Sequence, residues 1–233
     1  MLTKAQLEEY HNVGAIVVAD VLSMDEVQRL RRVTDEFVER ARGVTTHNEI
    51  YDLEDSHTPD NPRVRRIKLT HKQHPEYGNL VRHPKILAVL RDLWGPDIRF
   101  DTAKLNMKSA GFGAPVEWHQ DWAFYPHTND DLAAVGIMLD DCGMENGPMM
   151  VVPGSHLGPV YDHHGPDGRF CGAIDPTACD IDLSRAVPVA SVKSTCWLPG
   201  SICGACATSP SLTRTSTSGV PPPAETRMMP LRP

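Results

Sequence analysis

Apolar side chains recur at helical spacing in the region that follows Ser23. The positions that form this stripe are Val27, Leu30, Val33, Phe37 and Val38. Intervals of three and four residues place them on one face of a helix. Glu26 stands three residues after Ser23, an arrangement typical of a capping box. The pattern predicts a long amphipathic helix that begins after Ser23 and ends at Gly43.

Three more elements are predicted in the N-terminal part of the chain. Residues 2–11 carry apolar side chains at a spacing that suits a short helix, with Thr3 as its cap. The run "AIVVADVL" (15–22) is apolar and β-branched, which predicts a buried strand. The segment "HPKILAVLRDLWGP" (83–96) is amphipathic and ends in Gly and Pro, so we expect a second major helix there.

Outside these helices, short apolar runs alternate with turn residues. The strands that these runs predict lie within residues 64–69, 98–109, 133–141, 148–155 and 186–192. Two polar segments, 44–63 and 160–184, have the composition of loops, and we expect them to lie over the mouth of the β-rich part. Helices followed by short strands predict an α+β protein with an all-β core, a barrel or jelly roll.

The character of the sequence changes at Ser194. Residues 194–233 contain twelve Ser or Thr and seven Pro, but one Glu and no Asp, His, Tyr or Phe. This composition, without strand or helix periodicity beyond Cys206, predicts a disordered tail. We therefore expect one folded domain at residues 1–193, with a helical part at 1–95 and a jelly-roll part at 96–193 that is incomplete at its C-terminal end.

Length and charge restrict the class of protein. A chain of 233 residues can bury the core of one domain. The formal charge of -7 argues against a nucleic-acid or anionic-membrane surface, because no Lys/Arg stripe offsets the carboxylates. No apolar run is long enough for a membrane span, and the first residues do not resemble a signal peptide. We expect a cytoplasmic monomer or homodimer that binds a small molecule.

The six cysteines offer one rival site. Cys203 and Cys206 form a C-x-x-C pair, with Cys196 upstream. A structural zinc ion needs four ligands, and a redox pair of this kind belongs in a βαβ unit. The sequence supplies neither context. Irregular spacing instead favours reduced thiols, as in a cytosolic protein.

The segment "VEWHQDWAFYP" (116–126) carries the most specific chemistry. His119 and Asp121 flank Gln120, and on a strand residues i and i+2 point to the same face. A His-x-Asp pair with a distant second His forms the facial triad of non-haem Fe(II) oxygenases. By itself the triplet is weak, because about one is expected by chance in such a composition. The H-x-E triplets at 47–49 and 74–76 are rivals in loop-like or pre-helical surroundings.

The surroundings of this triplet resemble the phytanoyl-CoA dioxygenase family. The shared features are the His-Gln-Asp triplet, the aromatic cluster with Pro126, Asp-Leu before a strand, "ENGP" (145–148) and "PGSH" (153–156). The opening "EEYHNVGAIVVADVLSMDEVQRLR" (8–31) is also similar to the helix, strand and long helix with which the family begins. The resemblance covers about residues 1–195.

This resemblance implies a double-stranded β-helix of the cupin-like kind and an enzyme that uses Fe(II), 2-oxoglutarate and O2. It makes His119 and Asp121 iron ligands. The residues that it assigns to cofactor binding are Lys68, Gln120, Lys104 and, in the tail, Arg214. The residues that it assigns to the substrate pocket are Trp122, Phe124 and Tyr125. The implied reaction hydroxylates a small organic substrate and releases succinate and CO2.

Each assignment has a structural alternative. The three aromatic residues also suit an ordinary core. Lys68 also suits a solvated strand edge, and His156 suits a turn. His163 and His164 stand in a loop rich in Gly and Pro, which favours exposure to solvent over a role near the metal.

The distal part departs from the family pattern. The family's second iron-binding His is expected at about 204–214, yet the sequence has no His after His164. A change of reading frame near 192–197 would explain this and the composition of the tail. Two protein ligands predict weak iron binding and an inactive form. The alternatives are a non-catalytic jelly-roll binding protein and a cupin-like metal hydrolase or isomerase that uses His119 with loop histidines.

Overall fold

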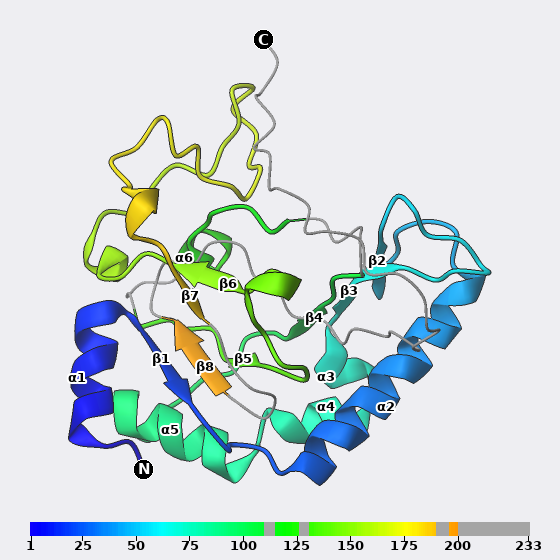
Figure 1. The fold of residues 1–233 in the computed structure, drawn as a ribbon, viewed down its shortest axis with the longest axis horizontal. Helices are drawn as coiled ribbons and strands as arrows, with labels where there is room; N and C mark the ends of the chain where they lie inside the picture. The colour runs from blue at the N-terminus through cyan, green and yellow to red at the C-terminus, as the bar shows by residue number, and fades with distance from the viewer. Residues whose placement is uncertain (110–114, 126–130, 190–195, 200–233) are drawn as a thin grey trace.

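The computed structural model describes residues 1–109, 115–125, 131–189 and 196–199. Helices dominate the first 95 residues, and short antiparallel strands dominate the rest (Figure 1). The helices are α1 (Lys4–Val13), α2 (Met24–Arg40), α3 (Thr70–Gln73), α4 (Pro75–Leu80), α5 (Pro84–Trp94) and α6 (Asp121–Phe124). Single 3-10 turns lie at Ala41–Gly43, Met144–Asn146, Ser155–Leu157 and Leu183–Arg185. No helix of the described part has the length and apolar character needed to cross a bilayer.

The predicted helix caps are confirmed. The Thr3 hydroxyl accepts the Gln6 N–H at 3.2 Å, and the Ser23 hydroxyl accepts the Glu26 N–H at 3.3 Å. Each helix thereby satisfies backbone donors that have no partner inside the helix. Gly14 ends α1 in the left-handed conformation, with φ of 82°. Two short helices, α3 and α4, were not predicted, because neither is long enough to display a periodic pattern.

The main hydrophobic core lies between helices α2 and α5 and the sheet formed by β2 (Tyr51–Leu53), β3 (Val64–Lys68) and β4 (Lys104–Asn106). The predicted stripe of α2 is confirmed, since Val27, Leu30 and Phe37 are buried almost completely. Tyr77 of α4 enters this core and shares a 2.6 Å hydrogen bond with the Thr34 hydroxyl of α2. The two hydroxyls therefore satisfy each other where water is excluded.

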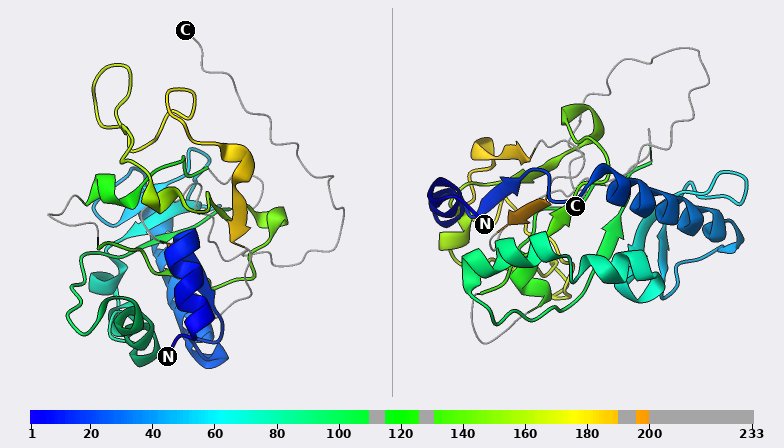
Figure 2. Two further views of the ribbon diagram at one scale, coloured as in Figure 1. Left: turned by 90° about the vertical axis from the view of Figure 1, so that its left-hand side faces the viewer. Right: turned by 90° about the horizontal axis from the view of Figure 1, so that it is seen from below.

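The strands form three small antiparallel sheets. They are β1 (Ala15–Val18), β2 (Tyr51–Leu53), β3 (Val64–Lys68), β4 (Lys104–Asn106), β5 (Gly136–Ile137), β6 (Met149–Val151), β7 (Val187–Val189) and β8 (Cys196–Pro199). The sheet orders are β1-β8-β5, β2-β3-β4 and β6-β7. Figure 1 shows α1 beside β1 and α5 below the sheets, and Figure 2 gives the same arrangement from two other sides. The predicted α+β class is confirmed, whereas the jelly roll, incomplete at its C-terminal end, stays a prediction.

Sheet β2-β3-β4 has one apolar and one charged face. Ile67 and Leu105 are paired in register and buried in the core. Lys68 pairs with Lys104, and Arg66 pairs with Asn106. Because side chains alternate along a strand, these four polar residues share the opposite face. This face, defined by Arg66, Lys68 and Lys104, is called the basic face below.

Two segments differ from the prediction. Residues 44–63 were expected to be a loop, but Tyr51–Leu53 forms β2 and buries Tyr51 and Leu53 against the core. Residues 194–233 were expected to be disordered, but Cys196–Pro199 forms β8 between β1 and β5. Pairing with two neighbours outweighs the weak local signal of four residues. The rest of the tail, and with it the change of reading frame, lies outside the described residues.

Candidate metal centre

His119 and Asp121 come together where an extended segment enters helix α6. The sequence predicted both on one strand, but Asp121 is the first residue of α6. The prediction that their side chains share one side survives, because Gln120 between them is extended, with φ of -112° and ψ of 126°. An extended residue points its two neighbours in the same direction even outside a regular strand. His119 Nε2 lies 3.4 Å from Asp121 Oδ1.

The hydrogen bonds of the His119 ring define what this pair can bind. The ring places Nδ1 at 2.7 Å from the Glu117 carbonyl oxygen, which accepts, so Nδ1 carries the proton. A neutral ring then directs the lone pair of Nε2 at a carboxylate oxygen. Two acceptors that face each other need a shared proton or a cation between them. Their separation is less than twice a metal–ligand bond of about 2.1 Å, so one metal ion can contact both.

Burial strengthens this arrangement. His119 is 6% exposed and Asp121 is 9% exposed, so the medium around them screens charge less than water does. Within the described residues no group of three His, Cys, Asp or Glu side chains is arranged to hold a metal ion. The pair thus fits two of the three protein positions of a facial triad. Arg214 and the Cys203–Cys206 pair lie outside the described residues.

Gln120, between the two ligands, is held by a loop that lies 39 to 43 residues later in the chain. Its backbone N–H donates to His163 Nε2 at 2.9 Å. Its side-chain Nε2 donates to the Pro159 carbonyl oxygen at 3.0 Å, and its Oε1 accepts the Tyr161 N–H at 2.7 Å. These three bonds engage the backbone N–H, the side-chain nitrogen and the side-chain oxygen of Gln120. They are called the Gln120 clamp below. The predicted contact of Gln120 with a cofactor stays a prediction.

His163 is the functional residue that the sequence missed. A solvated loop was expected for both histidines of the pair, and this is wrong for His163, which is 2% exposed. Its Nδ1 donates to the Tyr161 carbonyl oxygen at 2.8 Å, and burial lowers its pKa. His164 is exposed as expected and pairs with Asp162 at 2.6 Å. Turn-rich composition gives no periodic signal that separates the two.

Aromatic side chains of α6 lie beside His119. The Phe124 ring centroid is 5.4 Å from that of His119 and 5.1 Å from that of Phe170, both edge-on. Phe124 is 39% exposed, which suits a pocket wall better than a core residue. Burial raises the pKa of Tyr125, and the charge of Asp121 raises it further. Trp122 is half-buried. The assignment of these residues to a substrate pocket stays a prediction.

The basic face approaches the same region through Lys104. Its Nζ lies 5.9 Å from the centroid of the Phe124 ring, a weak cation–π contact. Lys68, the register partner of Lys104, forms a 3.0 Å ion pair with Asp52 Oδ1. Arg66 Nη1 lies 3.6 Å from the other oxygen of that carboxylate. One carboxylate thus offsets part of the positive charge of this face, and the cofactor-binding roles of Lys68 and Lys104 stay predictions.

Two further histidines considered in the sequence analysis have structural roles. His156 lies in a 3-10 turn, as predicted, and donates from Nε2 to the His11 carbonyl oxygen at 3.0 Å, where its ring packs on Gly14. His74 caps α4 by accepting the Glu76 N–H at 3.1 Å. The rival triplet at 74–76 is therefore a helix start.

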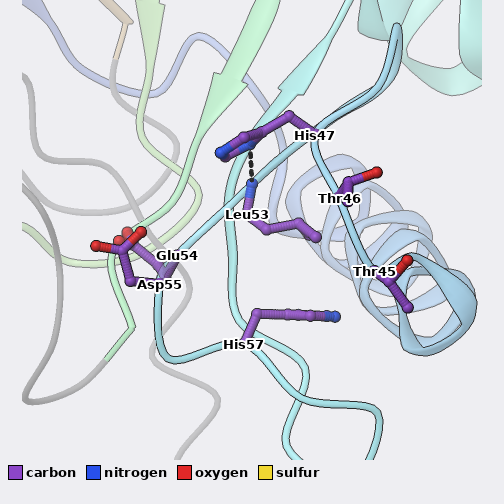
Figure 3. A pocket seen from close by; sticks show the side chains of 7 residues that line it. All are labelled: Thr45, Thr46, His47, Leu53, Glu54, Asp55 and His57. Atoms are coloured by element: carbon purple, nitrogen blue, oxygen red, sulfur yellow. Dashed lines mark hydrogen bonds between the residues drawn. The ribbon is translucent and has the colours of Figure 1, made fainter.

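The rival triplet at 47–49 borders a separate hollow. Figure 3 shows this pocket of about 260 Å³ within residues 44–63, and His47 Nδ1 accepts the Leu53 N–H at 3.1 Å. The residues that line it are Thr45, Thr46, His47, Leu53, Glu54, Asp55 and His57. None of them belongs to the predicted site.

Comparisons with known proteins agree with the resemblance seen in the sequence. The family model of phytanoyl-CoA dioxygenase (PhyH) matches residues 10–192. A probable alpha-ketoglutarate-dependent hypophosphite dioxygenase of Stutzerimonas stutzeri is 40% identical over 179 residues, which are 76% of this chain and 62% of that protein. An ectoine dioxygenase of Bordetella parapertussis is 30% identical over 160 residues, which are 66% of this chain and 50% of the relative.

The chain is also similar in fold to a solved oxygenase. A crystal structure of EctD from S. alaskensis with 2-oxoglutarate and 5-hydroxyectoine matches with a TM-score of 0.66 and 22% identity. The match covers 89% of this chain and 71% of that one. At this identity the match bears on the fold alone. The chain spans between half and two thirds of the length of the two curated relatives described above.

Proposed function

The chain belongs to the phytanoyl-CoA dioxygenase family, and we propose that it is an Fe(II)- and 2-oxoglutarate-dependent dioxygenase that hydroxylates a small molecule with release of succinate and CO2. The observation that carries the proposal is the pair of buried acceptors, His119 Nε2 and Asp121 Oδ1, which face each other at 3.4 Å.

His119 and Asp121 would hold the iron. The Glu117 carbonyl oxygen orients the His119 ring by accepting its Nδ1–H, so that Nε2 faces Asp121 and would be the metal-binding nitrogen of the neutral ring. When bound, iron would supply the positions at which 2-oxoglutarate and O2 react. Phe124 would exclude water from one side of the centre, because its ring packs edge-on next to His119, and Phe170 supports it by packing edge-on against Phe124.

The basic face would bind the carboxylate groups of 2-oxoglutarate. Lys104 of β4 lies over the Phe124 ring. Its register partner Lys68 and, two positions before that on β3, Arg66 lie on the same face of the sheet. Three cations opposed by Asp52 leave a positive balance on this face, although the chain as a whole is acidic. An anionic cosubstrate would therefore be drawn to this part of the molecule. Its approach would compete with Asp52 for the Lys68 ammonium.

The substrate would be a small molecule. The first candidate is hypophosphite, the substrate in the name of the relative that shares 40% identity. The same basic face suits a small anion, since its cations extend over more than one strand. Ectoine is the second compound to test, because a less similar relative is named for it.

Within this proposal the β-rich part would form a double-stranded β-helix. The antiparallel sheets β1-β8-β5 and β6-β7 are its two candidate layers. Both share one small buried cluster that includes Met138, Met149 and Val189, as expected for sheets packed face to face.

Anaerobic titration tests the metal centre. Addition of Fe(II) and 2-oxoglutarate to the apo chain should produce the weak visible charge-transfer band of the ternary complex. Asp121→Ala and His119→Ala should abolish the band, and His164→Ala, an exposed histidine 45 positions beyond His119, should leave it unchanged. Absence of the band in the unsubstituted chain, or its persistence in Asp121→Ala, would contradict the proposal in favour of a non-catalytic binding protein.

Turnover is tested separately. Succinate formation under O2 should be coupled to loss of hypophosphite or ectoine when each is supplied alone, and it should depend on Asp121. Hydrolysis or isomerisation of a substrate without consumption of O2 would instead favour a cupin-like metal hydrolase or isomerase.

A further inference from the structure

The Gln120 clamp connects the two candidate metal ligands to a distant loop. Gln120 is 2% exposed, and its N–H lies in the chain between His119 and Asp121. That N–H reaches a side-chain nitrogen, His163 Nε2, instead of a backbone carbonyl as in regular structure. A buried backbone N–H without an acceptor is destabilising, because nothing replaces the hydrogen bond that it makes to water. The geometry of the ligand segment thus depends on one imidazole.

The His163 ring is itself fixed from two sides. The Tyr161 backbone carbonyl oxygen accepts a hydrogen bond from Nδ1–H, which leaves Nε2 as an acceptor for the Gln120 N–H. The backbone carbonyl oxygen of His163 accepts the N–H groups of Cys171 and Gly172, at 2.9 and 3.2 Å. The ring can neither rotate nor shift without breaking several bonds, and the tautomer is determined by its neighbours.

The same loop contacts the ligand segment at two more points. The Ile174 N–H donates to the Trp118 carbonyl oxygen at 2.7 Å, directly before His119. Phe124, three residues after Asp121, packs against Gly172 so closely that a side chain on that glycine would overlap the ring. Residues 118–124 are therefore held before, between and after the two ligands.

We propose that His163 is a positioning residue for the metal centre: its Nε2 holds the backbone between His119 and Asp121 and thereby fixes the separation of the two ligand atoms. This inference rests on the proposed function for the identity of the metal, but the clamp belongs to the apo chain. His163 itself is no ligand in this arrangement, because both of its ring nitrogens are engaged.

Two substitutions separate the acceptor from the bulk of the ring. His163→Leu keeps an apolar side chain of similar reach but offers no acceptor to Gln120. His163→Gln has a carbonyl oxygen that can reach the position of Nε2. His164→Leu is the matched control, because His164 is the exposed neighbour and its ring Nδ1 bonds the Asp162 carboxylate, away from Gln120.

Co(II) binding to the apo chain, followed by visible absorption, measures the effect on the site without turnover. We expect His163→Leu to bind Co(II) about 10- to 100-fold more weakly, the usual consequence of removing a group that orients a metal ligand. His163→Gln should recover most of this loss, and His164→Leu should behave as the unsubstituted chain. Equal affinity of His163→Leu and the unsubstituted chain would overturn the inference, and so would a loss in His163→Gln as large as that in His163→Leu.

A second readout does not require metal. In the apo chain, nitrogen-15 spectra should give His163 as the Nδ1–H tautomer, and the Gln120 amide should exchange slowly with solvent. Exchange should accelerate in His163→Leu and remain slow in His163→Gln. The other tautomer, or fast Gln120 exchange in the unsubstituted chain, would overturn the inference. If no variant binds Co(II), the proposed function fails while these spectra still decide the role of His163. If His163→Leu does not fold, the Co(II) affinity and the Gln120 exchange rate of His163→Gln decide the role of His163.

Discussion

Residues 1–109 and the described residues between 115 and 189 are held together by different kinds of interaction. The larger buried cluster draws every member but Leu139 from the first region, whereas the smaller cluster has six members. The second region has fewer buried apolar side chains, and beside them it buries four polar ones, His119, Gln120, Asp121 and His163, against three, Thr34, Glu54 and Thr70, in the longer first region. Apolar packing is non-directional, while hydrogen bonds fix both distance and angle.

The difference indicates a division of labour. The first region supplies most of the free energy of folding, because the hydrophobic contribution grows with the apolar area removed from water. The second supplies less of that free energy and more of the geometry, because buried polar groups tolerate few arrangements. Substitutions in the two regions should therefore separate loss of stability from loss of metal binding.

The largest contrast is expected between two phenylalanines. Phe37 is 1% exposed, and its replacement by Ala should lower the free energy of unfolding by about 3–5 kcal/mol. Phe124 is 39% exposed, and its replacement by Ala should lower the free energy of unfolding by about 1 kcal/mol. Urea denaturation followed by tryptophan fluorescence measures both. Similar losses in the two variants would contradict the division between the regions.

Two glycines of the second region give a smaller and sharper contrast. Gly168 and Gly172 both have positive φ, at 73° and 67°. A Cβ at Gly168 would meet nothing, whereas at Gly172 it would lie 2.6 Å from Phe124 Cζ. Both Ala variants strain the backbone, but only Gly172→Ala also overlaps a ring. Gly172→Ala should therefore lower the free energy of unfolding by about 1–3 kcal/mol more than Gly168→Ala does. Adding Phe124→Ala should remove this difference. Thermal denaturation of the three variants checks it, and equal losses in the two single variants would mean that the ring moves freely.

The smallest contrast is between two side-chain caps. Ser23 caps the 17-residue helix α2, and its replacement by Ala should cost about 1 kcal/mol. Asp182 accepts the Ser184 N–H at the start of an exposed 3-10 turn, and Asp182→Ala should lower the free energy of unfolding by less than Ser23→Ala does, because the turn is short and exposed. Chemical denaturation of matched samples distinguishes them. A larger loss for Asp182 would show that the second region contributes more stability than its small core suggests.

The sequence predicts much of the first region because its order is periodic. The stripe of α2, the caps Thr3 and Ser23, and helix α5 all follow from local rules. Strand β2 was missed because three residues within a polar segment give little signal until β3 pairs with them. Strand β8 was missed for the same reason, since both of its partners are distant in sequence.

For the site, the sequence predicts the pair but not what holds it. His119 and Asp121 follow from a two-residue spacing that survives in the structure without the expected strand. The contact between Gln120 and His163 joins residues 43 positions apart, in a loop whose composition predicts exposure. Such contacts depend on how the loop closes, and neither periodicity nor residue type reveals that.

The contact between His156 and the end of α1 has a consequence for how the chain acquires its structure. The His156 ring fills the space beside Gly14 and donates to the His11 carbonyl oxygen, 145 positions earlier in the sequence. Gly154 adds a second bond, from its N–H to the Val13 carbonyl oxygen. Contacts of such separation close late, after local helices have formed. During synthesis, the end of α1 would therefore lack these contacts until the ribosome has released residue 156, and β1 would lack its partner strand until β8 follows.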